Sequence, residues 1–276
     1  MSDLPLPAVS PLPREQVAGV SLLHRPGTGT ELPLVLLHGI GSNSESWSPL
    51  LRVLDPAVEA LAWDAPGYGD SRPVPAPSPA PNDYAAALEA VLDALGHQTV
   101  LLVGHSLGCL FAARFAASRP NRVARLALCS PALGYGVPAG APLPPVVQAR
   151  IDDLDQLGPE DFAAKRAARL VFQPDQRPEV LAGVRRSMAA VNPAGYAQAV
   201  RALGAGDLLA DAPRLTMPVL VATGLEDVVT PPDNARRLFD ALPNGIRLAE
   251  LPNAGHAMPQ EMPQALAAIL GETLLG

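Results

Sequence analysis

The chain has 276 residues, of which 48% are hydrophobic and 17% are charged, and its formal net charge is −7. This is enough apolar material for one large domain, with or without an insertion. An acidic chain without clusters of lysine and arginine argues against a nucleic-acid or anionic-membrane partner, and no apolar run approaches the roughly 20 residues that a membrane-spanning helix needs.

The N-terminal segment and the cysteines bear on location. The first 16 residues are proline-rich and lack the basic and apolar parts of a secretory signal, so we expect an extended arm. Cys109 and Cys129 are too few for a disulfide framework or a zinc site, and a cytoplasmic location is the default expectation. We expect no cofactor and no metal ion, because no ligand spacing typical of a metal site is visible. The composition is compatible with a monomer and with a dimer.

Short apolar runs alternate with helical patterns along the chain, which is typical of a mostly parallel sheet with crossover helices. The proline-rich stretch 72–82 reads as an extended surface loop. The expected strands cover residues 17–23, 34–37, 60–63, 99–103, 123–129, 218–222 and 246–250. The expected helices cover residues 83–95, 107–117, 233–242 and 263–274.

The alternation stops between about residues 133 and 212, where four helical segments and no strand pattern occur. One amphipathic helix is spaced from Leu143 to Leu154, with Gly158 placed to end it. Another runs from Val180 to Val191. We therefore predict an α/β core of residues 1–132 and 213–276, and a helical lid of residues 133–212.

The strongest local pattern is an apolar strand that leads into Gly104-His105-Ser106-Leu107-Gly108 and then into a helix of small residues. G-x-S-x-G alone is a weak signal. A serine at a tight strand-to-helix turn, however, adopts strained backbone angles that push its hydroxyl out of the sheet, and the glycines let strand and helix pack closely. The alternative is a serine that only caps the helix. We predict that Ser106 is a nucleophile.

A serine hydroxyl needs a base that takes its proton. Of the five histidines, His24 and His97 adjoin turn residues, and His105 is expected to pack beneath the turn. We expect His38 to tie a glycine turn to neighbouring backbone. His256 follows the last strand, at the carboxyl edge where open α/β sheets place reactive groups. We predict that His256 is the base.

The base needs an acceptor for its other ring proton. Asp227 follows the strand at 218–222, in a loop at the same edge of the sheet. Glu226 is a neighbouring rival that spacing alone does not exclude. We favour Asp227, and the resulting order serine, aspartate, histidine is the order expected for this type of turn.

A second glycine turn, His38-Gly39-Ile40-Gly41, follows the strand at 34–37. Glycines there let a backbone N–H group approach a substrate closely. We predict that the N–H groups of Ile40 and Leu107 form an oxyanion hole, which stabilises a tetrahedral intermediate.

With these motifs the chain resembles the α/β-hydrolase superfamily, and within it the helical-lid esterases and lactonases such as 3-oxoadipate enol-lactonase. The resemblance covers nearly the whole chain and implies a mostly parallel central sheet flanked by helices, with an inserted helical lid. One departure is Cys109, where many relatives have a second glycine. The resemblance rests on HGIG at 38–41, DAPGYGDS at 64–71, GHSLG at 104–108, GLEDVVTP at 224–231 and AGH at 254–256.

The resemblance also implies an activity. Haloalkane dehalogenases and epoxide hydrolases of this fold have an aspartate at the position of Ser106, so the serine argues against both. The expected reaction is hydrolysis of a small carboxylic ester or lactone through an acyl-serine intermediate. Three alternatives stay open: an acyltransferase on the same triad, a carbon–carbon bond hydrolase, and a ligand-binding receptor with slow turnover.

The lid does not identify the substrate. Its apolar residues suit a pocket, but they equally suit packing of the lid on the core; they include Phe162, Phe172, Met188 and Tyr196. Its charges are mixed, and their balance carries no argument for an anionic substrate. The residues counted are Arg166, Arg169, Arg185 and Arg186 against Asp152, Asp153, Asp155 and Glu160.

Overall fold

The computed structural model describes residues 12–29 and 32–275. These residues form one sheet in the order β1-β2-β4-β3-β5-β6-β7-β8. β2 is antiparallel to its neighbours β1 and β4, and the strands from β4 to β8 are parallel. The strands are β1 (Arg14–Val17), β2 (Val20–Arg25), β3 (Leu34–Leu37), β4 (Ala60–Trp63), β5 (Val100–His105), β6 (Val123–Cys129), β7 (Val219–Gly224) and β8 (Gly245–Leu251).

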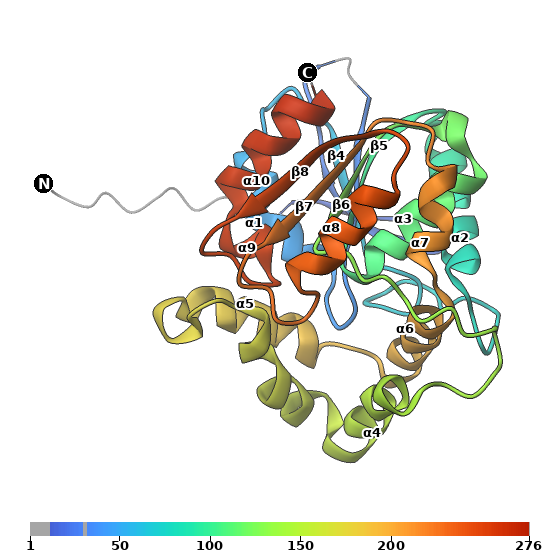
Figure 1. Ribbon diagram of the computed structural model, residues 1–276, viewed down its shortest axis with the longest axis vertical. Helices are drawn as coiled ribbons and strands as arrows, with labels where there is room; N and C mark the ends of the chain where they lie inside the picture. Colours follow the sequence, from blue (N-terminus) through green and yellow to red (C-terminus); the bar gives the residue numbers. More distant parts are fainter. Residues whose placement is uncertain (1–11, 30–31, 276) are drawn as a thin grey trace, which may run out of the picture.

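Helices cover both faces of the sheet (Figure 1). Alternate residues of a strand point to opposite faces, so Leu34 and Leu36 of β3 pack with one set of helices, and Val35 and Leu37 with the other. The first set is α1 (Ser48–Val53), α9 (Met258–Glu261) and α10 (Pro263–Leu270), preceded by the short helix η1 (Ser44–Trp47). The second set is α2 (Pro81–Leu95), α3 (Leu107–Ser118) and α8 (Pro232–Ala241), with η2 (Pro120–Arg122) after α3.

The expected α/β-hydrolase fold is confirmed, and most expected elements lie within two residues of the observed ones. The single strand expected at 17–23 is wrong, because the chain forms a hairpin there, β1 and β2. Its turn is Ala18-Gly19, in which both residues have positive φ (50° and 84°), a conformation that lets two strands pair through a two-residue loop. Most of the expected N-terminal arm is residues 1–11, which lie outside the described residues. The last residues of the expected arm belong to β1.

Two helical predictions also need correction. No helix was expected between the strands at 34–37 and 60–63, where η1 and α1 form the crossover. The helix expected at 263–274 ends at Leu270, and a single turn of π-helix, η6 (Gly271–Leu275), follows it.

Between β6 and β7 the described chain contains helices and no strand. Their longest member, α4, is broken at Gly158 (φ 71°, ψ 166°), where its first half ends as expected, and Pro159 begins the second half at once. Of these helices, α4, α5 and α6 lie below the sheet in Figure 1. They are α4 (Pro145–Arg166), η3 (Ala167–Leu170), η4 (Pro174–Gln176), α5 (Pro178–Ala189), α6 (Pro193–Ala205), α7 (Leu208–Asp211) and η5 (Ala212–Arg214). The division into core and lid stays a prediction.

None of the described helices combines the length and apolar character that crossing a membrane requires.

One close backbone approach between these helices and the core is between Gly195 of α6 and Gly67. A Cβ atom at Gly195 would lie 1.9 Å from the Gly67 carbonyl oxygen. The clash is with backbone, so no side-chain rotation relieves it. The absence of a side chain at Gly195 therefore sets how closely α6 docks on the core.

We expect Gly195→Ala to destabilise the protein, although alanine is the better helix former. Forcing a methyl group into this contact should lower the free energy of unfolding by about 1–3 kcal/mol. The matched control is Gly271→Ala, because a Cβ there meets open space. Urea unfolding of both variants checks this, and equal midpoints would contradict the packing argument.

Candidate active site

Ser106 joins β5 to α3 and has φ 54° and ψ −115°, a strained conformation for a residue with a side chain. Its N–H group donates to the Cys129 carbonyl oxygen at 2.9 Å, which ties the turn to the neighbouring strand β6. The turn is therefore anchored on the sheet while the Ser106 side chain leaves it.

The glycines around Ser106 are required by close packing. A Cβ atom at Gly104 would lie 2.5 Å from the Gly108 carbonyl oxygen, and one at Gly108 would lie 2.2 Å from the Leu37 carbonyl oxygen. A Cβ atom at Gly39 would lie 2.8 Å from the Cβ atom of Ser106. Strand, helix and the glycine turn after β3 thus meet with only hydrogen atoms between them, which is the reason for the G-x-S-x-G spacing.

The structure brings the three predicted triad residues together. His256 Nε2 lies 3.0 Å from Ser106 Oγ, and His256 Nδ1 lies 2.8 Å from Asp227 Oδ2. Asp227 is an acceptor, so the Nδ1 atom carries the proton and Nε2 is free to accept from the serine hydroxyl. All three side chains are buried.

The two oxygen atoms of the Asp227 carboxylate have different hydrogen-bond partners. Oδ1 accepts from the backbone N–H groups of Val229 (2.8 Å) and Thr230 (2.9 Å), which leaves Oδ2 for His256. Burial raises the pKa of Asp227, but the His256 pair and these N–H groups outweigh it and lower the pKa to about 2. The group therefore stays ionised at any pH near neutral.

Glu226 lies next to this pair but does not reach His256. Its Oε2 atom accepts from the Ala254 N–H group at 3.0 Å, and its own N–H group donates to the Ala254 carbonyl oxygen. Glu226 therefore braces the loop that carries His256, and the carboxylate at the histidine ring is that of Asp227.

His105 and His38 are both buried and both hold backbone. His105 Nε2 donates to the His256 carbonyl oxygen at 2.8 Å, while burial and the neighbouring His256 lower the pKa of His105 to about 3. His38 Nδ1 donates to the Gly39 carbonyl oxygen, and its Nε2 accepts from the Ala65 N–H group. Burial also lowers the pKa of His38. The packing roles expected for both are confirmed, and His105 additionally fixes the loop of His256.

The two predicted oxyanion donors lie on either side of Ser106. Leu107 is the first residue of α3, where a helix leaves its N–H groups without an intrahelical partner. Ile40 lies in the glycine turn that packs on Ser106. Neither N–H group finds an acceptor within the part of the chain that the structure describes. Both are therefore available to an anion beside Ser106.

Two residues of the site were not predicted. Thr230 Oγ1 lies 2.9 Å from Asp227 Oδ2 and 3.1 Å from His256 Nδ1, so its hydroxyl contacts both Asp227 and His256. Its sequence signal is a threonine three residues after Asp227, just before a proline-led helix, a spacing typical of side-chain–backbone turns.

The second is Glu261, whose carboxylate is fully buried. It accepts from Arg177 Nη1 and from the N–H groups of Phe172 and Gly255. No local pattern marks Glu261, because its partners are far away in sequence. It joins the helices below the sheet to the loop of His256.

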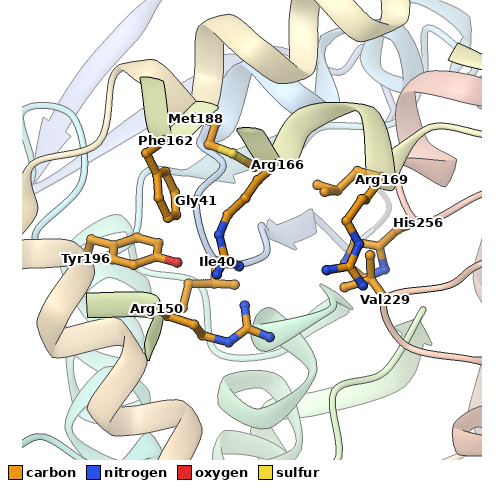
Figure 2. Close-up of a pocket in the computed structure, with 11 residues that line it drawn as sticks. Ile40, Gly41, Arg150, Phe162, Arg166, Arg169, Met188, Tyr196, Val229 and His256 are labelled. Atoms are coloured by element: carbon orange, nitrogen blue, oxygen red, sulfur yellow. The ribbon is translucent and has the colours of Figure 1, made fainter. Parts of the chain in front are cut away.

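A cavity of about 100 Å³, partly open to solvent, adjoins His256 and Ile40 (Figure 2). Three of the four apolar residues named from the sequence line it, namely Phe162, Met188 and Tyr196; Phe172 does not and lies beneath Arg177 instead. Phe162 and Tyr196 also contact each other edge to face, at 5.3 Å between ring centroids. Their side chains thus both wall the cavity and pack α4 against α6.

Comparison with known proteins agrees with this geometry. Residues 33–261 match the family described as alpha/beta hydrolase fold. Over 245 residues the chain is 29% identical to 2-hydroxy-6-oxononadienedioate/2-hydroxy-6-oxononatrienedioate hydrolase 2 of Pseudomonas putida, covering 83% of this chain and 82% of that protein.

Two solved structures share nearly the whole fold. A thermophilic esterase from Thermogutta terrifontis, with malate bound, has a TM-score of 0.83 and 25% identity, and covers 95% of this chain and 98% of that chain. The enol-lactonase from Burkholderia xenovorans LB400 has a TM-score of 0.82 and 26% identity, and covers 96% of this chain and 100% of that chain. Since the family match, the relatives and the fold agree, the chain belongs to the α/β-hydrolase fold family of hydrolases.

Proposed function

We propose that this hydrolase cleaves a small carboxylic ester or lactone through an acyl-serine intermediate. The observation that carries the proposal is the continuous hydrogen-bonded series from Ser106 through His256 to Asp227. It ends at a serine with strained backbone angles, a feature that is frequent at active sites. The cavity beside His256 supplies room for a small substrate.

In the first half of the reaction, His256 Nε2 takes the hydroxyl proton of Ser106 as Oγ attacks the carbonyl carbon. The carbonyl oxygen becomes an oxyanion, which the N–H groups of Ile40 and Leu107 stabilise. Asp227 stays ionised and stabilises the imidazolium that has formed. The carbon–oxygen bond to the leaving group then breaks, and His256 returns its proton to the departing oxygen.

In the second half, water attacks the acyl-serine carbonyl and gives a proton to the same His256 nitrogen. The tetrahedral intermediate collapses to a free acid, and the proton returns to Ser106 Oγ. In a lactone the leaving hydroxyl stays attached to the acid, so one hydroxy acid is the product.

We propose that residues 133–212 act as the lid of this site. Phe162, Met188 and Tyr196 supply the apolar walls of the cavity, and Glu261 ties the lid segment at Phe172 and Arg177 to the loop of His256. A lid held in this way excludes water from the acyl-enzyme except along the cavity.

A second candidate is hydrolysis of a carbon–carbon bond next to a ketone. It is favoured by the relative from Pseudomonas putida, since the compounds in that protein's name are oxo dioates without an ester bond. The two candidates differ in the bond that breaks, so turnover of simple esters against turnover of an oxo dioate separates them.

We expect the native chain to hydrolyse p-nitrophenyl esters from acetate to decanoate, with a preference for short chains because the cavity is small. Ser106→Ala should lower kcat at least about 10⁴-fold, because no other residue supplies the nucleophile. Release of p-nitrophenolate measures both. Turnover that survives in Ser106→Ala would overturn the assigned nucleophile. No turnover of esters, but turnover of 2-hydroxy-6-oxononadienedioate, would favour carbon–carbon cleavage.

We expect Asp227→Asn to lower kcat about 10⁴-fold, because an amide does not stabilise the imidazolium and favours the wrong tautomer. The matched control is Glu226→Gln, where the amide oxygen still accepts from Ala254; its kcat should fall by less than about tenfold. Steady-state kinetics on the best ester compares them. A larger loss in Glu226→Gln than in Asp227→Asn would reverse the assignment.

A further inference from the structure

Three arginines line the cavity beside His256, and we call them the arginine cluster: Arg150, Arg166 and Arg169. Arg150 and Arg166 lie on the two halves of α4, and Arg169 lies on η3. Figure 2 shows their guanidinium groups pointing into one space, together with Ile40 and His256. The cluster therefore faces the same cavity as the predicted base and an oxyanion donor.

The cluster is poorly neutralised by the protein. Arg166 pairs with Asp153 at 2.8 Å, but Asp153 also pairs with Lys165 at 2.9 Å. Within residues 12–29 and 32–275, no carboxylate lies within salt-bridge distance of Arg150 or Arg169, and no acidic side chain lines the cavity. The other lid acids in the sequence count, Asp152, Asp155 and Glu160, are exposed.

Some of the hydrogen-bonding groups of the cluster are also unused. The Nε atoms of Arg150 and Arg166 are buried and have no hydrogen-bond partner among the described residues. Burying a donor without an acceptor is unfavourable, and so is holding three like charges together. A bound anion would remove both costs.

The positive charge is confined to one side of the site. A second, smaller cavity of about 30 Å³ also adjoins Ile40 and His256, and no arginine, lysine, aspartate or glutamate lines it. The chain as a whole is acidic, with a net charge of −7. The cluster is therefore a local feature of one cavity and does not follow from a basic surface.

The chemistry of the cluster favours a carboxylate. A guanidinium group presents two parallel N–H donors that match the two oxygens of a carboxylate. Arg166 is held in place by Asp153 on one side and by the Phe162 ring, 5.1 Å from its carbon Cζ, on the other. Tyr196 adds a hydroxyl, and burial keeps it neutral by raising its pKa. Because Arg166 is already held in this way, it can bind an anion without much loss of side-chain entropy.

We infer that the arginine cluster binds a carboxylate of the substrate, so that the substrate class is small esters or lactones that carry a free carboxylate. The inference rests on the proposed function for the hydrolysis of the bound substrate. The binding of a carboxylate by the arginines does not depend on that reaction. Electrostatic attraction would draw the anion into the cavity. With its carboxylate bound by the guanidinium group of Arg150 or Arg169, the substrate would have its scissile carbonyl beside Ser106.

The test compares mono-p-nitrophenyl adipate with p-nitrophenyl hexanoate, which has the same chain length but no carboxylate. We expect the native chain to have the higher kcat/KM on the adipate ester. Arg150→Gln and Arg169→Gln should each lower the ratio of the two kcat/KM values by about tenfold or more, mainly through KM. The matched control is Arg185→Gln, an exposed lid arginine outside the cavity, which should leave both values unchanged.

A binding experiment separates this inference from the proposed function. Calorimetry of adipate with Ser106→Ala should show binding that is lost when Arg169→Gln is added. If both esters turn over and the ratio is the same in native and arginine variants, the reaction stands and the inference is wrong. If neither ester turns over but adipate binds through the arginines, the inference stands and the ester reaction is wrong. Equal binding of inorganic phosphate would overturn the choice of carboxylate.

Discussion

The backbone conformation of Ser106 is the constraint on which the site depends. A residue with a side chain held at φ 54° and ψ −115° costs about 1–3 kcal/mol, and it persists because the surrounding contacts leave no room to relax. Gly104, Gly108 and the Leu37 carbonyl group lock α3 against β3 and β5. The same geometry leaves the Leu107 N–H group without a partner among the described residues and brings the Ser106 hydroxyl within 3.0 Å of His256. Strain at one residue therefore positions both the hydroxyl proposed as nucleophile and one of the two proposed oxyanion donors.

The remaining parts reach Ser106 from the carboxyl ends of parallel strands. Ile40 follows β3, Asp227 follows β7 and His256 follows β8, so the sheet brings all three to one edge. The helical segment between β6 and β7 is coupled to the same frame, because the buried carboxylate of Glu261 accepts from the N–H groups of both Gly255 and Phe172. Burial raises the pKa of Glu261, and its carboxylate has three partners: Arg177 and the N–H groups of Phe172 and Gly255. A displacement of Phe172 or Arg177 is thus expected to shift the loop that carries His256.

Much of this site was predictable because its signals are local. The strand-turn-helix around Ser106 and the loops of Asp227 and His256 each occupy a few consecutive residues. The choice between Asp227 and Glu226 was not decidable from spacing, since it depends on how a turn directs adjacent side chains. The arginine cluster was missed for a different reason. Arg150 and Arg166 meet only because α4 breaks at Gly158 and folds back, whereas Asp152, Asp155 and Glu160 point to solvent. A count of charged residues in the sequence does not show which of them face the cavity.

The central claim is that the strained Ser106 hydroxyl is the group that the site activates. Its most direct test is labelling with an ethyl p-nitrophenyl alkylphosphonate, which reacts once with an activated serine and cannot be hydrolysed further at a useful rate. The account predicts one equivalent of p-nitrophenolate per chain and, by peptide mass mapping, a single adduct on Ser106. It also predicts much slower labelling of His256→Ala. An adduct on a different residue, or labelling of His256→Ala at the native rate, would contradict it.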